Sequence, residues 1–314
     1  MGNSRNAGVR LGAVEIAVQA VRDLAPNASL AREAAKLWRA EVVASTALAG
    51  STLDLSEVDS LLDHGLARGD HPLAQYLMVR AYADAARWVA DQRIIPVGDP
   101  QPLLTVEDLR LLHARVAAGS TLHPGAWRQS NPAPRAGIVP PAAWLVPREV
   151  DAAIDHLGRG PYDMRIANWI ARFMGRIGRI RPFEGGNGRT ARLAANLMLR
   201  RIDFQPIVFE RAERARYVAA IAAAESGEPE QLADLIVDAV MRSCNRLRAA
   251  ARASTDPLAP LRELAGDSYA MLAKAAQRGT LRTVTRGGRY YTTRDWIGNY
   301  RLTHQRVRSG RPEA

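Results

Sequence analysis

The sequence predicts an all-α protein, and three observations support this fold class. Apolar residues recur at spacings of three and four along most of the chain, which is the period of an amphipathic helix. Alanine is abundant, whereas stretches that alternate apolar and polar residues, as half-buried strands do, are few. The 314 residues, 47% of them hydrophobic, are enough for a sizeable core and for two or three domains.

The periodic segments predict a succession of helices separated by turn-forming or polar residues. In chain order they are Ala13–Leu24, Ser29–Leu48, Leu55–His64, His71–Val89, Val106–Ala117, Pro147–Leu157, Asp163–Ile177, Asn187–Arg200, Glu213–Glu225 and Pro229–Ala253. The segment Leu122–Val146 interrupts this succession with several glycines and prolines and with two tryptophans. An irregular segment of this length inside a compact domain usually has a functional role.

The helical pattern ends near residues 253–260, where serine, aspartate and prolines cluster. After this boundary we expect a short helix at Asp267–Gln277 and a hairpin of Leu281–Val284 with Arg289–Thr292 around Gly287–Gly288. A last helix is expected at Thr293–Tyr300, with Thr293 as its N-cap. The predicted domain limits are therefore residues 1–105, 106–253 and 258–314.

Composition excludes several classes of protein. No run of about 18 uncharged apolar residues is present, so no transmembrane helix is expected. The charged first ten residues precede no apolar segment of the kind that secretion signals carry, and we expect a cytoplasmic protein. A single cysteine, Cys244, excludes an internal disulfide and a cysteine-based zinc site.

The net charge of +11 is unevenly distributed. Residues 257–314 hold 11 of the 43 basic residues but 4 of the 32 acidic ones, and nearly all the basic residues are arginine. One interpretation is a tail that meets an anionic partner. The other is a solvated surface that reflects a general preference for arginine.

The segment Ile180–Arg192 has the features of a phosphate-binding loop. Its three glycines permit close backbone approach, and a helical pattern begins directly after them. The N–H groups at a helix start bind anions, and Arg189 and Arg192 share one face of that helix. Cations at the positive end of a helix are unfavourable unless an anion lies between them. The alternative is a glycine-rich turn between two helices, with solvated arginines.

This loop resembles the signature of the Fic (Fic/Doc, fido) family, His-x-Phe-x-Asp/Glu-Gly-Asn-Gly-Arg-x-x-Arg. The matching residues here are Phe183, Gly186, Asn187, Gly188, Arg189 and Arg192. Ser45–Gly50 resembles the family's inhibitory helix, Pro124-Gly125-x-x-Arg128 lies where the family has a target-docking flap, and the whole resemblance covers about Arg32–Arg246. It implies a Fic helical core with a short flap hairpin (122–146) and transfer of AMP from ATP, or of another phosphate-linked group, to a protein hydroxyl.

Three positions depart from the family's pattern. Arg181 stands where the family has its catalytic histidine, Gly185 where it has the magnesium-binding acid, and Ala49 where it has the inhibitory glutamate. An arginine stays protonated and cannot act as a base, but it binds phosphate well. Ala49 cannot pair with Arg192, which indicates either a site freed from autoinhibition or a site with nothing left to inhibit.

The resemblance and its departures define candidate site residues. Arg181 is expected to stabilise charge, and Gly186, Asn187, Gly188, Arg189 and Arg192 to bind the nucleotide or phosphoester. Glu184 either turns inwards as a base or metal ligand or faces solvent. His113 and His156 are each either a displaced base or structural. ATP or another phosphoester is the expected ligand, no metal site is predicted, and magnesium is doubtful.

The segment Ser268–Tyr300 resembles the winged helix-turn-helix modules of the excisionase and MerR type. The resemblance implies contacts to DNA phosphates from a basic wing and helix. The candidate DNA-binding residues are Arg278, Arg282, Arg286, Arg289 and Arg294. Two functions therefore remain open: an atypical enzyme of phosphate-linked transfer or cleavage, or a non-catalytic regulator that binds nucleotide and DNA.

Overall fold

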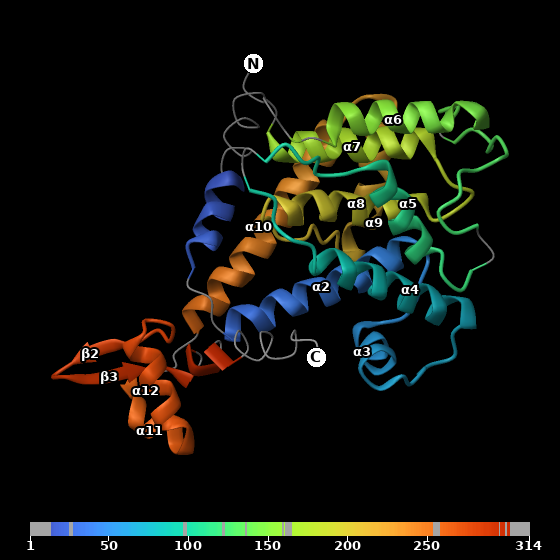
Figure 1. Ribbon diagram of the computed structural model, residues 1–314. Helices are drawn as coiled ribbons and strands as arrows, with labels where there is room; N and C mark the ends of the chain where they lie inside the picture. Colours follow the sequence, from blue (N-terminus) through green and yellow to red (C-terminus); the bar gives the residue numbers. More distant parts are fainter. Residues whose placement is uncertain are drawn as a thin grey trace, which may run out of the picture. The chain divides into compact units, whose positions relative to one another are not determined.

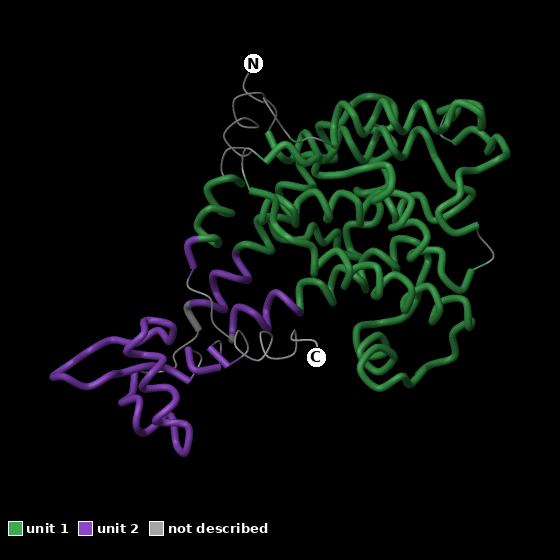
Figure 2. The backbone as a smooth tube through the Cα atoms, viewed as in Figure 1, with its two compact units in different colours: residues 1–22, 36–244 green, residues 23–35, 245–314 purple. Residues whose placement is uncertain are grey.

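The computed structural model describes residues 14–24, 28–96, 99–120, 123–135, 137–158, 160, 165–253, 258–294, 296–298 and 300–301 (Figure 1). Within these ranges the chain divides into two compact units (Figure 2). The first comprises residues 1–22 and 36–244, and the second residues 23–35 and 245–314. The predicted domain limit in Ser254–Pro257 lies outside the described residues, and the three-way division stays a prediction.

The predicted succession of helices is confirmed, and most limits agree to within a few residues. After a helical segment at residues 14–22, the helices are α2 (Ala28–Leu48), α3 (Leu55–His64), α4 (Leu73–Ala90), α5 (Val106–Val116), α6 (Val146–Leu157), α7 (Ile166–Ile180), α8 (Asn187–Arg201), α9 (Arg214–Ser226) and α10 (Glu230–Ala253). Capping boxes at Asp54 and Thr105 set the starts of α3 and α5. No described helix combines the length and apolar character needed to cross a bilayer.

Helix α7 lies at the centre of the first unit, where it packs against α6, α8 and α9. Its apolar side chains are buried, and the Trp169 indole donates a hydrogen bond to the Leu157 carbonyl oxygen. The approach to α9 is close because α7 has glycine at two positions. A Cβ atom at Gly175 would lie 2.4 Å from the Ala224 carbonyl oxygen, and one at Gly178 would lie 2.6 Å from the Glu225 carboxylate.

Helix α7 ends later than predicted, at Ile180 instead of Ile177. Gly178, just after the predicted end, stays helical and is a contact point for α9. The actual end is at Arg181, whose φ of 45° is in the left-handed region. Such a φ is uncommon for an arginine and marks the start of the loop between α7 and α8.

The expected flap contains little regular structure. Within its described residues, Arg135 and Ile138 form one antiparallel bridge, and a 3₁₀ turn at Ala143–Leu145 leads into α6. Arg128, which is 2% exposed, holds the segment together. Its guanidinium donates to the carbonyl oxygens of Arg181, Ser130, Pro141 and Ile180, and so joins this segment to the end of α7.

The second unit contains a small antiparallel sheet of order β1-β3-β2. Its elements are β1 (Ala259–Pro260), α11 (Leu261–Ala265), α12 (Tyr269–Gln277), β2 (Val284–Arg286) and β3 (Arg289–Thr292). The hairpin around Gly287–Gly288 is confirmed by the pairing of Arg286 with Arg289. The Trp296 N–H donates to Thr293 Oγ1, which confirms the predicted cap.

The first strand of this hairpin was predicted too early, at Leu281–Val284. Thr280 and Leu281 both donate their N–H groups to the Ala275 carbonyl oxygen, so they form the turn that follows α12 and not a strand. Leu281 is buried with Leu261, Leu272 and Ile297 in the core of this unit. The strand β1 was not predicted, because a two-residue strand carries no periodicity.

Candidate functional site

The loop between α7 and α8 presents a helix N-terminus to a cavity. Gly186, at a φ of 70°, is the N-cap of α8, and the first intrahelical hydrogen bond runs from the Thr190 N–H to the Gly186 carbonyl oxygen. The N–H groups of Asn187, Gly188 and Arg189 therefore have no acceptor within the helix. Such groups, together with the helix dipole, favour an anion.

The Asn187 side chain holds the loop in shape. Its Oδ1 accepts from the Phe183 N–H at 2.9 Å, and its Nδ2 donates to the Phe183 carbonyl oxygen at 2.8 Å. The side chain is thereby used within the loop, so the group that Asn187 offers to a ligand is its backbone N–H.

The His113 side chain packs against the loop between α7 and α8 and forms hydrogen bonds that hold it in place. Its ring stacks on Phe183 with a centroid distance of 3.7 Å. Nδ1 accepts from the Gly125 N–H at 3.0 Å, so Nε2 carries the proton and donates to the Gly185 carbonyl oxygen at 3.2 Å. Burial lowers the pKa of His113 to about 4. Of the two roles considered for this histidine, a neutral structural support fits these contacts.

The loop borders a cavity of about 590 Å³. Its lining includes Arg181, Glu184, the segment Gly186–Arg189, Arg192, Ala49 and, from other parts of the chain, Arg135, Tyr217 and Glu225. The structure thus brings the candidate residues of the loop together with the position of the inhibitory motif. Arg135, Tyr217 and Glu225 were not expected from the sequence.

Arg189 and Arg181 are partly buried cations of this cavity. Burial and the nearby Arg192 lower the pKa of Arg189, whose Nη1 lies 3.4 Å from the Val116 carbonyl oxygen. Arg181 donates from Nη1 to the Ala133 carbonyl oxygen at 3.0 Å, and its Nη2 is buried with no hydrogen-bond partner among the described residues. Guanidinium groups with unmet donors beside a helix N-terminus suit an anionic ligand.

The Arg192 guanidinium forms hydrogen bonds with Ser45 and Tyr217 of the protein itself. It is 6% exposed, and Nε and Nη2 donate to the Oγ and carbonyl oxygen of Ser45 at 2.5 and 2.8 Å. Nη1 donates to the Tyr217 hydroxyl at 3.2 Å. Helix α2 therefore holds Arg192 through Ser45, one turn before Ala49, and a phosphate would have to compete with these contacts.

A carboxylate lies near this network. Glu41, on the same helix α2, is 2% exposed and accepts from the Tyr82 hydroxyl at 2.7 Å. Burial raises the pKa of Glu41 to about 7, against the opposing effects of Tyr82 and Arg192. No sequence motif marks Glu41, Tyr82 or Tyr217, because all three lie in helices and follow the helical pattern.

The residues present do not form a magnesium site at the loop. Gly185 has no side-chain ligand, and Glu184 is exposed at the edge of the cavity. No group of three or more histidine, cysteine, aspartate or glutamate residues within the described ranges could hold a metal ion. Of the two carboxylates in the described lining, Glu184 is exposed and Glu225 is buried and paired with Arg135.

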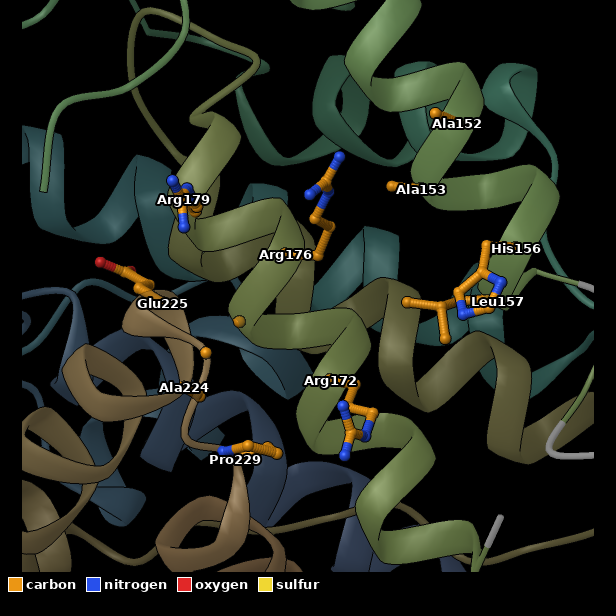
Figure 3. A pocket seen from close by; sticks show the side chains of 12 residues that line it. Ala152, Ala153, His156, Leu157, Arg172, Arg176, Arg179, Ala224, Glu225 and Pro229 are labelled. Atoms are coloured by element: carbon orange, nitrogen blue, oxygen red, sulfur yellow. The ribbon is translucent and has the colours of Figure 1, made fainter. Parts of the chain in front are cut away.

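His156 lies in a different cavity, of about 410 Å³, on the exposed face of α6 and α7 (Figure 3). Arg172, Arg176 and Arg179 of α7 line it, and Arg176 pairs with Glu149 at 2.9 Å. No residue of the loop 181–192 belongs to this lining, although Glu225 borders both cavities. His156 is therefore not placed among the loop residues.

The five candidate DNA-binding arginines are all exposed on the second unit. Arg286 and Arg289 end β2 and begin β3, on either side of the Gly287–Gly288 turn. The Arg282 guanidinium lies 4.3 Å from the centre of the Trp296 ring, and that of Arg286 lies 5.8 Å from the Tyr291 ring.

Helices α4 to α9 around a glycine-rich loop that precedes a helix N-terminus define a Fic-type helical core. Residues 103–199 match the sequence model of the Fic/DOC family. The matched range runs from the start of α5 almost to the end of α8, so it contains the whole loop.

Curated relatives carry the name protein adenylyltransferase Fic. The one from Aedes aegypti is 22% identical over 69% of this chain and 43% of its own length. The one from Nematostella vectensis is 26% identical over 59% of this chain and 42% of its own length. The chain thus spans less than half the length of these relatives.

Solved structures share the fold. Fic-1 from C. elegans superposes with a TM-score of 0.71 at 20% identity, covering 80% of this chain and 74% of that one. A Fic-domain-containing signaling protein from Bacteroides thetaiotaomicron has a TM-score of 0.68 at 20% identity, covering 78% and 98%. The likeness confirms the predicted Fic-type helical architecture.

Proposed function

We propose that this chain binds a nucleotide or a related phosphoester in the loop cavity and transfers or cleaves a phosphate-linked group there. The observation that carries the proposal is the convergence on one cavity of the α8 N-terminus, Arg189 and Arg181. The match to the Fic/DOC family and the adenylyltransferase names of its relatives make ATP the first ligand to test.

The proposed reaction differs from ordinary AMP transfer in the groups available. The resemblance assigns the proton acceptor to position 181 and the metal ligand to position 185, where this chain has Arg and Gly. An arginine at position 181 binds the phosphate chain and stabilises charge that develops on it. The nucleophile is a hydroxyl group of a protein target or a water molecule.

Nucleotide binding is tested with Arg189→Ala. Removing this guanidinium from the helix N-terminus is expected to weaken ATP binding by about tenfold or more, since hydrogen bonds to charged groups contribute roughly 1.5–3 kcal/mol. Calorimetric titration of the full chain with ATP measures it. Arg87→Ala, an exposed arginine on α4, is the matched control and should bind ATP as the unaltered protein does. Equal affinities for all three proteins would contradict the proposal.

Group transfer is tested with ATP labelled at the α-phosphate. We expect label on the chain itself or on proteins of a lysate, and we expect Arg189→Ala to abolish it. This result would support catalysis of group transfer. ATP binding without label or cleavage products supports a second candidate function, a non-catalytic regulator that binds nucleotide and DNA.

The observation in favour of that second candidate is the exposed pair Arg286 and Arg289 at the tip of the hairpin. Exposed arginines on a hairpin suit the DNA phosphate backbone, and the affinity should then fall steeply with salt. A gel-shift titration at two salt concentrations, with an Arg286→Ala/Arg289→Ala double variant, measures it. Binding that is the same in both proteins would contradict DNA binding through the hairpin.

A further inference from the structure

Glu225 is a buried acidic residue whose negative charge is disfavoured by its position at the end of a helix. It lies in the last turn of α9 (Arg214–Ser226), where the helix dipole disfavours a negative charge. Its side chain is 3% exposed. Oε1 accepts from Arg135 Nη2 at 2.7 Å, whereas Oε2 is buried and has no hydrogen-bond partner among the described residues. An acid that is buried, half-satisfied and opposed by the dipole costs stability, which calls for a functional reason.

The sequence of α7 makes room for this carboxylate. A Cβ atom at Gly178 would lie 2.6 Å from Glu225 Oε1 and 3.0 Å from its Cγ, so a side chain there would displace it. Gly178, Arg181 and Glu225 all line the loop cavity. The carboxylate therefore lies beside the position where the family signature has its histidine, although it comes from a different helix.

One guanidinium nitrogen of Arg181, in the same cavity, lacks a hydrogen-bond acceptor among the described residues, and one carboxylate oxygen of Glu225 lacks a donor. Arg181 Nη2 is a buried donor without a partner, and Glu225 Oε2 is a buried acceptor without one. Both residues line the loop cavity. Burial and Arg135 lower the pKa of Arg181, and Glu225 raises it, which places the two groups within electrostatic reach. A ligand that brings a phosphate oxygen and a hydroxyl group would satisfy both.

We propose that Glu225 is the proton acceptor for the hydroxyl nucleophile and that Arg181 binds the phosphate under attack. This inference rests on the proposed function. The hydroxyl oxygen forms a bond to the α-phosphorus of a nucleoside triphosphate, and the bond from that phosphorus to the bridging oxygen breaks. Pyrophosphate leaves with the electron pair, and the hydroxyl proton passes to Glu225 Oε2 and then to water. A carboxylate has the same task in protein kinases.

Because Oε2 is buried, the proposal needs a neighbouring side chain to move, and Arg135, which contacts Oε1, is the candidate. This side chain is 62% exposed and belongs to the irregular segment between α5 and α6. When it moves, the ion pair with the buried carboxylate is lost, and the hydroxyl group of the ligand takes its place. Glu184, the other carboxylate in the described lining of this cavity, is exposed and is not held against α7. This difference favours Glu225 as the acceptor.

The test compares two substitutions in the full chain with ATP as the probe. Glu225→Gln keeps the length of the side chain and an acceptor for Arg135 but cannot take a proton, whereas Glu225→Asp keeps the base but shortens the contact. Formation of AMP and pyrophosphate, and labelling of the chain from α-labelled ATP, give the rate. We expect a loss of about 10²-fold or more in Glu225→Gln, a smaller loss in Glu225→Asp, and no change in ATP affinity for either.

A structural role gives the opposite order. If Glu225 only anchors Arg135, Glu225→Asp should lose more than Glu225→Gln, and this result would overturn the inference. The control Glu228→Gln, at an exposed position just after α9, should match the unaltered protein.

The two levels of the proposal fail differently. Equal rates in Glu225→Gln and the unaltered protein overturn the role of Glu225 and leave the transfer reaction standing. ATP binding with no AMP formed by the unaltered protein overturns both the role of Glu225 and the enzyme, and leaves the nucleotide site. Absence of ATP binding overturns the proposed function itself.

Discussion

The loop cavity and the second unit are both rich in arginine, but they use it differently. Arg128 and Arg192 of the first unit are 2% and 6% exposed, and each makes several hydrogen bonds to residues distant in the sequence. The candidate DNA-binding arginines of the second unit are all exposed. A buried guanidinium that meets several acceptors holds its surroundings in one arrangement, whereas an exposed one contributes mainly its charge. The number of arginines in a segment therefore says little about which task they have.

The largest expected effect restores the groups that the family signature has at the loop. Arg181→His together with Gly185→Asp should raise AMP transfer from ATP in the presence of magnesium by about 10²-fold or more, because a base and a metal ligand are added. The backbone accepts both changes: histidine is tolerated at the positive φ of position 181, and Gly185 is not at a positive φ. Labelling from α-labelled ATP measures it. No gain would show that the cavity differs from the family's site in more than these two residues.

The second prediction is that replacing a buried arginine lowers the free energy of unfolding far more than replacing an exposed one. Arg192→Leu leaves Ser45 and Tyr217 without their donor and Glu41 without a nearby positive charge. The free energy of unfolding should fall by about 3–5 kcal/mol, the cost of removing one partner of a buried charged group. Urea unfolding measures it.

The exposed position Arg289 provides the matched comparison. Arg289→Leu should change the free energy of unfolding by no more than about 0.5 kcal/mol, as surface substitutions usually do. Losses of similar size in Arg192→Leu and Arg289→Leu would break the distinction between the two regions.

A third prediction concerns His113, which packs against the loop between α7 and α8. His113→Phe keeps the stacking on Phe183 but leaves the Gly125 N–H and the Gly185 carbonyl oxygen without partners, at a cost of about 1–3 kcal/mol.

The same substitution should alter the pH dependence of stability. Burial lowers the pKa of His113 from 6.5 to about 4, so between these values the unfolded chain binds a proton that the folded chain does not. Stability from this group is therefore lost as the pH falls through that window. Unfolding followed across the window should show this loss in the unaltered protein and not in His113→Phe. An identical slope in both proteins would contradict the neutral, buried state of His113.

The sequence predicted those features of the fold and site that depend on near neighbours. The helices follow from apolar periodicity, and the hairpin from Gly287–Gly288 between short strands. The phosphate-binding loop follows from glycines directly before a helix. Two signals for Glu225 were present but not used: an acid in the last turn of a helix, and glycines spaced three apart in α7.

Other features depended on contacts between distant segments. Ser45 reaches Arg192 across 147 positions, and Arg135 reaches Glu225 across 90. Nothing in the local pattern of α2 or α9 identifies these partners, because each residue fits its own helix equally well without them.

By itself the sequence determined that this chain is helical and that a glycine-rich loop precedes α8. The tertiary structure alone decided that Arg192 is held by Ser45, that His113 is a neutral support, and that Glu225 and Arg181 line one cavity. The physical reason is that backbone conformation follows from local periodicity and turn residues. The task of a charged side chain, in contrast, follows from its burial and partners, which form only when remote helices pack together.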